Sequence, residues 1–199
     1  DSSRWVIFPK LSYANHAKIE ERNAGLSDEF SSYERNVITE GTCRKGIVAQ
    51  GISYANVKDY IDNREGEKPA LLKISTPFPF PEKLAEDFLK GVDEVLVVEE
   101  LDPYIERHLV YVAGRSGLNV KIKGKITGNV ARSGENLPDL VHKYVNDFMG
   151  WESSSSNLPN TPELPVRPPV LCAGCPHRAS FYAKKAMKGK ETNFAGDIG

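Results

Sequence analysis

The fold class follows from one stretch of the sequence, Asp93-Glu94-Val95-Leu96-Val97-Val98-Glu99-Glu100. Four apolar residues, three of them β-branched, stand between pairs of charges, which is typical of a strand buried on both faces. Similar runs occur elsewhere, and each is followed by a helical pattern. We therefore expect an α/β domain at 41–150 with a doubly wound, mainly parallel sheet and right-handed crossovers. The expected strands are 46–51, 69–74, 93–100 and 120–124, and the expected helices are 53–61, 82–90, 103–113 and 137–149.

Polar residues follow three of these strands. They are Ser53 and Tyr54, Ser75-Thr76-Pro77, and Glu99-Glu100. Ligands of parallel sheets bind beyond the carboxyl ends of the strands, so this edge is where we look for a site. The two glutamates are adjacent in a strand and must point to opposite faces, which argues against a converged acid/base pair. Ser53 is a candidate N-cap for its helix.

Composition excludes several functional classes. The 199 residues carry 26 basic and 27 acidic side chains, with a net charge of −1. This balance removes the electrostatic case for binding nucleic acid or an acidic membrane surface. No stretch approaches the ~18 apolar residues of a membrane span, and no signal peptide is recognised. Three cysteines are few and odd in number, which favours a reducing compartment, the cytoplasm.

The segments on either side of the α/β domain do not show its alternation of strands and helices. Residues 1–40 predict an exposed linker helix with a narrow apolar face, and 151–169 are a Ser/Pro-rich linker that can continue neither helix nor central strand. Residues 170–199 are too short for a domain and resemble the beginning of a second one. The chain opens without Met and closes on Gly196-Asp197-Ile198-Gly199, so we expect an internal segment of a larger protein.

The sharpest chemical motif is Leu171-Cys172-Ala173-Gly174-Cys175-Pro176-His177-Arg178. Two thiols at this spacing, with Gly in the turn between them, converge on one point and suit a metal, a cluster or a redox disulfide. Zinc would need two more ligands, and no second pair exists in the sequence. A helix from Ala179 to Met187 would lower the pKa of a thiol at its N-terminus. A stand-alone metal or redox module, and a plain α/β interaction domain with inert thiols, both stay open.

Taken in order, five blocks of the sequence resemble one family, the thiamine-diphosphate-dependent indolepyruvate ferredoxin oxidoreductases, which belong to the 2-oxoacid:ferredoxin oxidoreductases. The blocks cover nearly the whole chain, and the Cys-rich one is the most specific. They are Gly46 to Tyr54, Thr76 to Pro81, Glu94 to Glu100, and Arg167 to Arg178, followed by Gly196 to Gly199.

The resemblance implies a domain plan and a reaction. Residues 1–40 would lead out of a pyrimidine-binding domain, 41–150 would be transketolase C-terminal-domain-like, and 170–199 would begin the diphosphate-binding domain. The family oxidatively decarboxylates aryl pyruvates with coenzyme A, giving aryl-acetyl-CoA and reduced ferredoxin. The implied partners are a beta subunit and ferredoxin, and the implied cofactors are thiamine diphosphate, Mg and 4Fe–4S clusters. This segment alone is not expected to be active.

The resemblance also implies roles for single residues. Cys172 and Cys175 match two cluster-ligating cysteines of related enzymes, although Pro176 stands where those have Gly and offers no N–H to a cluster sulfur. In the alternative reading, this segment is a pocket wall in which His177 and Arg178 contact cofactor or substrate.

Two further sets of residues take their roles from the same resemblance. Asp197 and Gly199 would bind the cofactor from the last turn of the chain. Glu99-Glu100 and Thr76-Pro77 would lie at a subunit interface rather than act as catalysts.

Overall fold

A computed structural model describes residues 8–152, 165, 170–171 and 173–186 of the chain. Its centre is a five-stranded sheet in the order β1-β3-β2-β4-β5. Strands β2 to β5 are parallel, and β1 runs antiparallel to β3 at one edge. The expected parallel sheet is confirmed. Its strands are β1 (Val37–Thr39), β2 (Lys45–Ala49), β3 (Ala70–Lys73), β4 (Glu94–Val98) and β5 (Lys121–Lys123).

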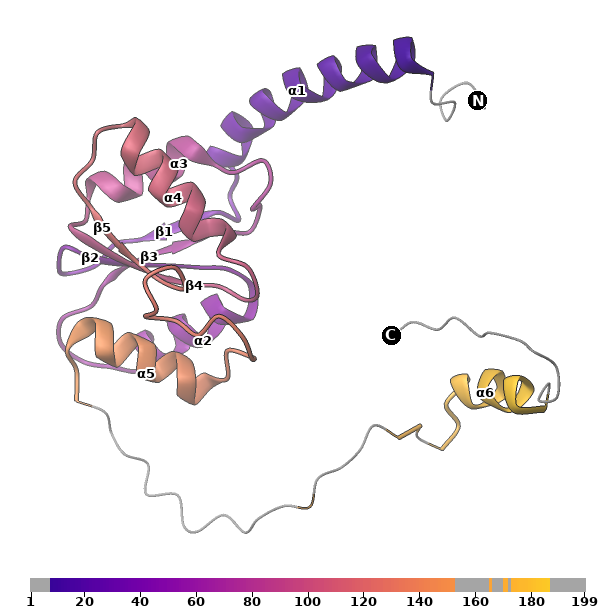
Figure 1. The fold of residues 1–199 in the computed structure, drawn as a ribbon. Helices are drawn as coiled ribbons and strands as arrows, with labels where there is room; N and C mark the ends of the chain where they lie inside the picture. The colour runs from indigo at the N-terminus through magenta and orange to yellow at the C-terminus, as the bar shows by residue number, and fades with distance from the viewer. Residues whose placement is uncertain (1–7, 153–164, 166–169, 172, 187–199) are drawn as a thin grey trace. The chain divides into compact units, whose positions relative to one another are not determined.

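Helices cover both faces of the sheet (Figure 1). Helices α3 (Glu82–Lys90) and α4 (Tyr104–Arg115) pack on one face, and α2 (Gly51–Asp62) and α5 (Pro138–Met149) pack on the other. This is the doubly wound arrangement predicted from the alternation of strands and helices. Each predicted helix of the 41–150 segment is present, with its limits shifted by only a few residues.

The core is divided into two layers by the alternation of side chains along each strand. In β4, Val95 and Val97 contribute to the layer beneath α3 and α4, whereas Leu96 and Val98 contribute to the layer beneath α2 and α5. All four are buried, because successive strand residues face opposite sides and both sides carry helices. The apolar run that predicted the fold is therefore an interior strand of the sheet, paired with β2 and β5.

Two features of the domain differ from the expectations. Strand β1 was not predicted; it lies within the segment expected to be a linker helix and pairs with β3, Ile38 opposite Leu72. The expected N-cap at Ser53 is wrong, because α2 begins at Gly51 and is capped at Gln50. Ser53 instead lies fully buried inside the first turn.

The helix expected in the first forty residues is present as α1 (Pro9–Ser31), and none of its residues is buried. Its C-terminal end contacts α3 and the segment that leads into it. Ser27 Oγ donates to the backbone carbonyl of Phe80 at 2.6 Å, and the Lys83 ammonium lies 2.8 Å from an Asp28 carboxylate oxygen. Segment 8–40 thus supplies a sheet strand and a helix docked through its last turns.

The chain divides into two compact units, 1–154 and 155–199. The division falls inside the segment 151–169, which the sequence predicts to be a linker. In the second unit the structure describes one helix, α6 (His177–Ala186), which covers the expected helix after the Cys-rich motif.

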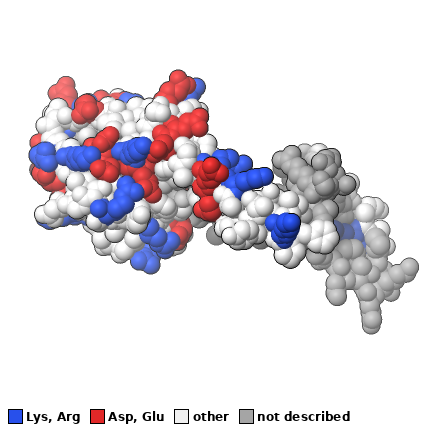
Figure 2. All heavy atoms as spheres, turned by 90° about the horizontal axis from the view of Figure 1, so that it is seen from above, with Lys and Arg blue, Asp and Glu red and all other residues white. Residues whose placement is uncertain are grey.

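Charge on the α3 and α4 side of the domain is mixed. Figure 2 shows acidic and basic side chains interspersed over this face. Ion pairs account for much of the pattern, for example Arg115 with Glu82 and Lys90 with Glu86. No single-sign patch is seen on the face in view. Within the described residues, no helix combines the length and apolar character needed to cross a membrane.

Candidate functional site

The first candidate site is a pocket at the carboxyl edge of the sheet. It lies where β2, β3 and β4 end, between crossovers that leave to opposite faces, the position at which open α/β sheets bind ligands. Residues from all three strand ends line it: Gln50, Gly51, Ile52, Lys73, Ile74, Ser75 and Glu100.

The polar groups of this pocket hold loops together. Ser75 Oγ donates to the Arg35 carbonyl at 2.7 Å, and a Glu100 carboxylate oxygen accepts from the Asn136 amide at 3.1 Å. The Lys73 ammonium lies 5.4 Å from the ring centre of Tyr54. Nucleophilic catalysis requires a nucleophile that is hydrogen-bonded to a base. No such pair is found among these lining residues. Ser75 and Glu100 of this pocket are therefore engaged in holding the surrounding loops.

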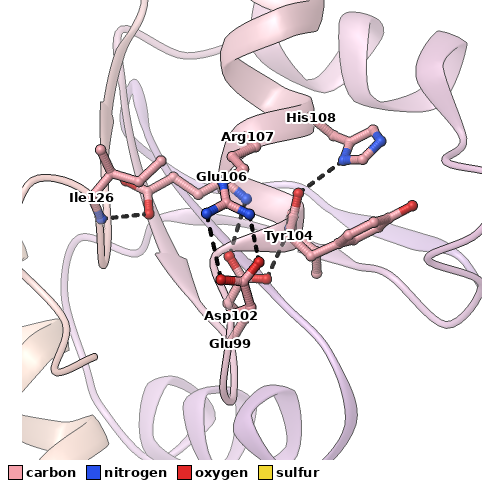
Figure 3. Close-up of polar contacts among 8 residues, drawn as sticks. Glu99, Asp102, Tyr104, Glu106, Arg107, His108 and Ile126 are labelled. Atoms are coloured by element: carbon pink, nitrogen blue, oxygen red, sulfur yellow. Dashed lines mark hydrogen bonds and ion pairs between the residues drawn. The ribbon is translucent and has the colours of Figure 1, made fainter. Parts of the chain in front are cut away.

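Glu99 has a structural role that could not be inferred from its position in the sequence. Its carboxylate is fully buried and accepts hydrogen bonds from the backbone amides of Ile105 at 2.8 Å and Glu106 at 3.0 Å. These are free amides of the first turn of α4, so Glu99 caps that helix from the end of β4 (Figure 3). Burial raises the pKa of Glu99, against the lowering effect of the two amides.

Two more buried charges continue this network toward the loop after β5. The Glu106 carboxylate accepts from the Ile126 amide at 2.9 Å, and the Lys125 ammonium, only 2% exposed, donates to the Ala131 carbonyl at 2.7 Å. The side-chain amide of Asn136 bridges Ser53 Oγ and the Glu99 carbonyl. Every buried side-chain polar atom of the described residues has a partner, so the network is complete.

The predicted divergence of the two glutamates is confirmed. Glu99 points inward to α4, whereas Glu100 is half-buried on the other side and bonds the Asn136 backbone. The expectation that Glu99 contributes to an interface is wrong, because its side chain is inaccessible. Thr76 is also engaged within the domain, since its Oγ1 accepts from Asn36 Nδ2 at 2.6 Å.

The raised pKa of Glu99 predicts a pH-dependent contribution to stability. A folded-state pKa above the unfolded value means that the native state holds the proton more tightly, so stability falls as pH rises. The fall begins near the unfolded value, about 4.3, and ends above the folded one. We expect the free energy of unfolding of the native chain, relative to Glu99→Gln, to decrease across this window. Urea denaturation of both proteins at several pH values measures the difference between their free energies of unfolding. A difference that stays constant or increases as pH rises would contradict the raised pKa of Glu99.

The second candidate site is the described part of the Cys-rich motif. Gly174 adopts a left-handed turn with φ of 81°, and the Arg178 amide donates to the Cys175 carbonyl at 3.1 Å as α6 begins. Cys175 Sγ lies 3.3 Å from His177 Nδ1, and among the described residues its thiol forms no disulfide. The turn therefore presents a thiol and an imidazole together at the start of a helix. Cys172, Asp197 and Gly199 lie outside the described residues.

This geometry suits a reactive or metal-binding sulfur. Thiol sulfur and imidazole nitrogen are both common metal ligands, and the turn places them within reach of one another. Cys175 is half-exposed, so its sulfur is accessible to a ligand. No group of three metal-binding side chains occurs within the part of the chain that the structure describes. Cys175 could therefore contribute one sulfur ligand to a metal site that other residues complete.

Comparison with known proteins extends over the whole chain. The indolepyruvate oxidoreductase subunit IorA of Methanothermobacter thermautotrophicus is 34% identical over 207 residues, which cover 100% of this chain and 33% of that protein. The same-named subunit of Pyrococcus abyssi is 33% identical over 98% of this chain, and that of Archaeoglobus fulgidus 38% identical over 77%. The resemblance to the indolepyruvate oxidoreductase family is confirmed. This chain spans about one third of the length of the IorA subunits it matches. No domain-family profile matches it.

The Cys-rich turn and the site at the carboxyl edge of the sheet were predictable from the sequence. The buried network of Glu99, Glu106 and Lys125 was not. Lys125 and Glu106 sit in charged, ordinary-looking stretches, where such residues are nearly always solvated. The only signal was indirect: the run Lys121 to Lys125 alternates, and Lys125 falls beyond the end of the strand, where a loop can fold over it. Its burial depends on that loop, residues 124–136, which no local pattern predicts.

Proposed function

We propose that this chain is a segment of the alpha subunit of an indolepyruvate ferredoxin oxidoreductase. The observation that carries the proposal is the match to IorA subunits along the entire chain. The reaction would convert an aryl pyruvate and coenzyme A to aryl-acetyl-CoA and carbon dioxide, with both electrons passed to ferredoxin. Because those relatives are about three times longer, a working enzyme in which this segment is one part is better supported than a stand-alone metal or redox module.

Residues 41–150 would serve as the transketolase C-terminal-like domain of that subunit. The doubly wound sheet agrees with this assignment, and the partnered polar groups of its carboxyl edge support a role in architecture rather than in chemistry. The segment 170–199 would open the diphosphate-binding domain. On this proposal, the segment by itself is inactive and requires the remainder of the subunit, together with a beta subunit.

Thiamine diphosphate and Mg would bind next to the second unit. When bound, thiamine diphosphate supplies the nucleophilic carbon at which the oxoacid is decarboxylated. On this side of the site His177 and Arg178 would contact the cofactor or the substrate carboxylate, with Asp197 and Gly199 placed at the diphosphate. The described geometry supports the first pair, since both belong to the opening turn of α6, where helix amides favour anions.

Cys172 and Cys175 would ligate a 4Fe–4S cluster that carries electrons away from the cofactor. The free, half-exposed sulfur of Cys175 at a helix start supports this role. We expect Cys175→Ala in the full-length subunit to lose one cluster's worth of iron and the matching electron paramagnetic resonance signal. The control is Cys43→Ala, a thiol that donates to the Lys68 carbonyl inside the α/β domain, which should leave iron content unchanged. Unchanged iron in Cys175→Ala would contradict cluster ligation by this thiol and leave the segment only its contacts from His177 and Arg178 to cofactor or substrate.

The proposed activity is tested on the full-length subunit co-purified anaerobically with its beta subunit. We expect indolepyruvate to drive ferredoxin reduction, and we expect the rate to collapse when thiamine diphosphate or coenzyme A is left out. Ferredoxin reduction that is independent of both would contradict the proposal.

A further inference from the structure

The residue that follows Cys175 cannot donate a backbone hydrogen bond to a sulfur. Pro176 has no N–H, so the turn lacks one backbone donor beside the Cys175 thiol. Hydrogen bonds to the sulfurs are among the factors that set the reduction potential of an iron–sulfur cluster. Each such bond favours the reduced cluster, because a donor stabilises the additional negative charge. A side chain that supplied a donor here would therefore raise the potential of a cluster bound through Cys175.

The imidazole of His177 is in position to supply this donor. Its Nδ1 lies 3.3 Å from Cys175 Sγ, and within the described residues no other hydrogen bond reaches this sulfur. The backbone of the turn brings the two side chains together. Gly174 takes the left-handed conformation, and the Arg178 amide donates to the Cys175 carbonyl at 3.1 Å. The contact is thus made within one turn and does not depend on where the second unit lies.

The direction of this hydrogen bond follows from the state of the sulfur. A free thiol can donate its proton to an imidazole nitrogen, whereas a sulfur that ligates a metal is a thiolate and has no proton to donate. When Cys175 is a ligand, the hydrogen between the two atoms must therefore belong to Nδ1 of His177. In the neutral ring, Nε2 is then the acceptor.

We infer that His177 is a positioning residue that acts through the Cys175 sulfur, with its Nδ1–H in place of the backbone donor that Pro176 lacks. The hydrogen bond raises the reduction potential of the cluster and fixes the tautomer of the ring, which leaves Nε2 available to the cofactor or the substrate. Donors of this kind, outside the ligand set, tune many metal sites. The inference rests on the proposed function, in which Cys175 ligates a 4Fe–4S cluster.

The test uses the full-length subunit purified anaerobically with its beta subunit, and it measures the cluster potential by a redox titration followed by electron paramagnetic resonance. His177→Phe keeps a ring but removes the donor. We expect this variant to retain its iron while the equilibrium shifts about tenfold toward the oxidised cluster, which is about 59 mV for a one-electron couple. His177→Asn should keep most of the wild-type potential, because its amide can donate from nearly the same position.

The matched control is His16→Phe, the same substitution at an exposed position of α1. It should leave the potential unchanged. A potential in His177→Phe equal to that of the wild type would overturn the inference, because the sulfur would then gain nothing from the imidazole.

Isotopically labelled histidine distinguishes a hydrogen bond from direct ligation. Pulsed electron paramagnetic resonance of the reduced wild-type cluster should detect a weak coupling to a histidine nitrogen, and this coupling should be absent from His177→Phe. A strong coupling, as from a nitrogen bound to iron, would make His177 a ligand and would overturn the inference. Loss of iron from both His177→Phe and His177→Asn would overturn it as well, because the amide of Asn still supplies a donor.

The outcomes separate this inference from the proposed function. If the wild-type complex oxidises indolepyruvate but the potential of its cluster is the same in His177→Phe, the hydrogen bond is overturned and the proposed function stands. If the wild-type complex holds a cluster that Cys175→Ala abolishes but has no activity with indolepyruvate, the proposed function fails while the potentials still test His177. If Cys175→Ala keeps all of its iron, the assignment of the ligand fails and the inference fails with it.

Discussion

Replacing Glu99 by Ala is expected to lower the free energy of unfolding by about 3 kcal/mol. The substitution leaves the buried amides of Ile105 and Glu106 without acceptors, and each unsatisfied group costs about 1–3 kcal/mol. It also removes a buried carboxylate that Lys125 attracts, an attraction that lowers the pKa of Glu99. Relief of the desolvation that Glu99 suffers offsets part of this loss. Urea denaturation followed by circular dichroism near neutral pH measures the change.

The control for Glu99 is Asp87→Ala on the outer side of α3. Asp87 pairs with Lys90 at an exposed site, where such pairs contribute less than about 1 kcal/mol. A change at Glu99 no larger than the change at Asp87 would mean that water replaces the carboxylate, and that the cap is dispensable.

The other large effect is expected in the core of the sheet. Leu72→Ala should destabilise the domain by about 2–5 kcal/mol, the range for a buried leucine that leaves a cavity. Leu72 is fully buried in β3, between β1 and β2, and belongs to the cluster beneath α3 and α4. Neighbours on both sides are held by the strand ladder, so the site has little freedom to collapse. The change is read from the urea midpoint of the purified protein.

Val37→Ala is the matched control for the core substitution. Val37 lies in edge strand β1, opposite Lys73 in the next strand, and is 38% exposed. Removing two methyl groups at this edge should cost less than about 1 kcal/mol. Equal losses of free energy of unfolding at Leu72 and Val37 would show that β1 contributes as much to stability as β3 does. The hydrophobic core would then extend to this edge strand.

The fold of the 41–150 segment was largely predictable because its strands are buried on both faces. A run such as Val95 to Val98 has few alternatives to a central parallel strand, and Pro103 marks the approach to the next helix. Strand β1 was not predictable, since Val37–Thr39 is three residues long and gains its place only by pairing with β3. The start of α2 was misplaced because Ser53 has the chemistry of a cap but is buried against Asn136.

The candidate site was predictable only in part. The side chains of Glu99 and Glu100 point to opposite sides because side chains alternate along a strand, so this difference was predictable from the sequence. The capping of α4 by Glu99 depends on the left-handed turn at Leu101, which no residue type at that position announces. The Cys175 turn was found because Gly between thiols is a local signal. The contact between Cys175 and His177 is equally local, although the resemblance indicated the histidine as a contact to cofactor or substrate.

The products of the reaction distinguish the proposed enzyme from its alternatives. Indolepyruvate, coenzyme A and oxidised ferredoxin are incubated anaerobically with the full-length subunit and its beta subunit, and the organic product is identified by mass spectrometry while ferredoxin reduction is followed. The account predicts that indoleacetyl-CoA accumulates in step with reduced ferredoxin. Release of the free aldehyde or acid without ferredoxin reduction would contradict it.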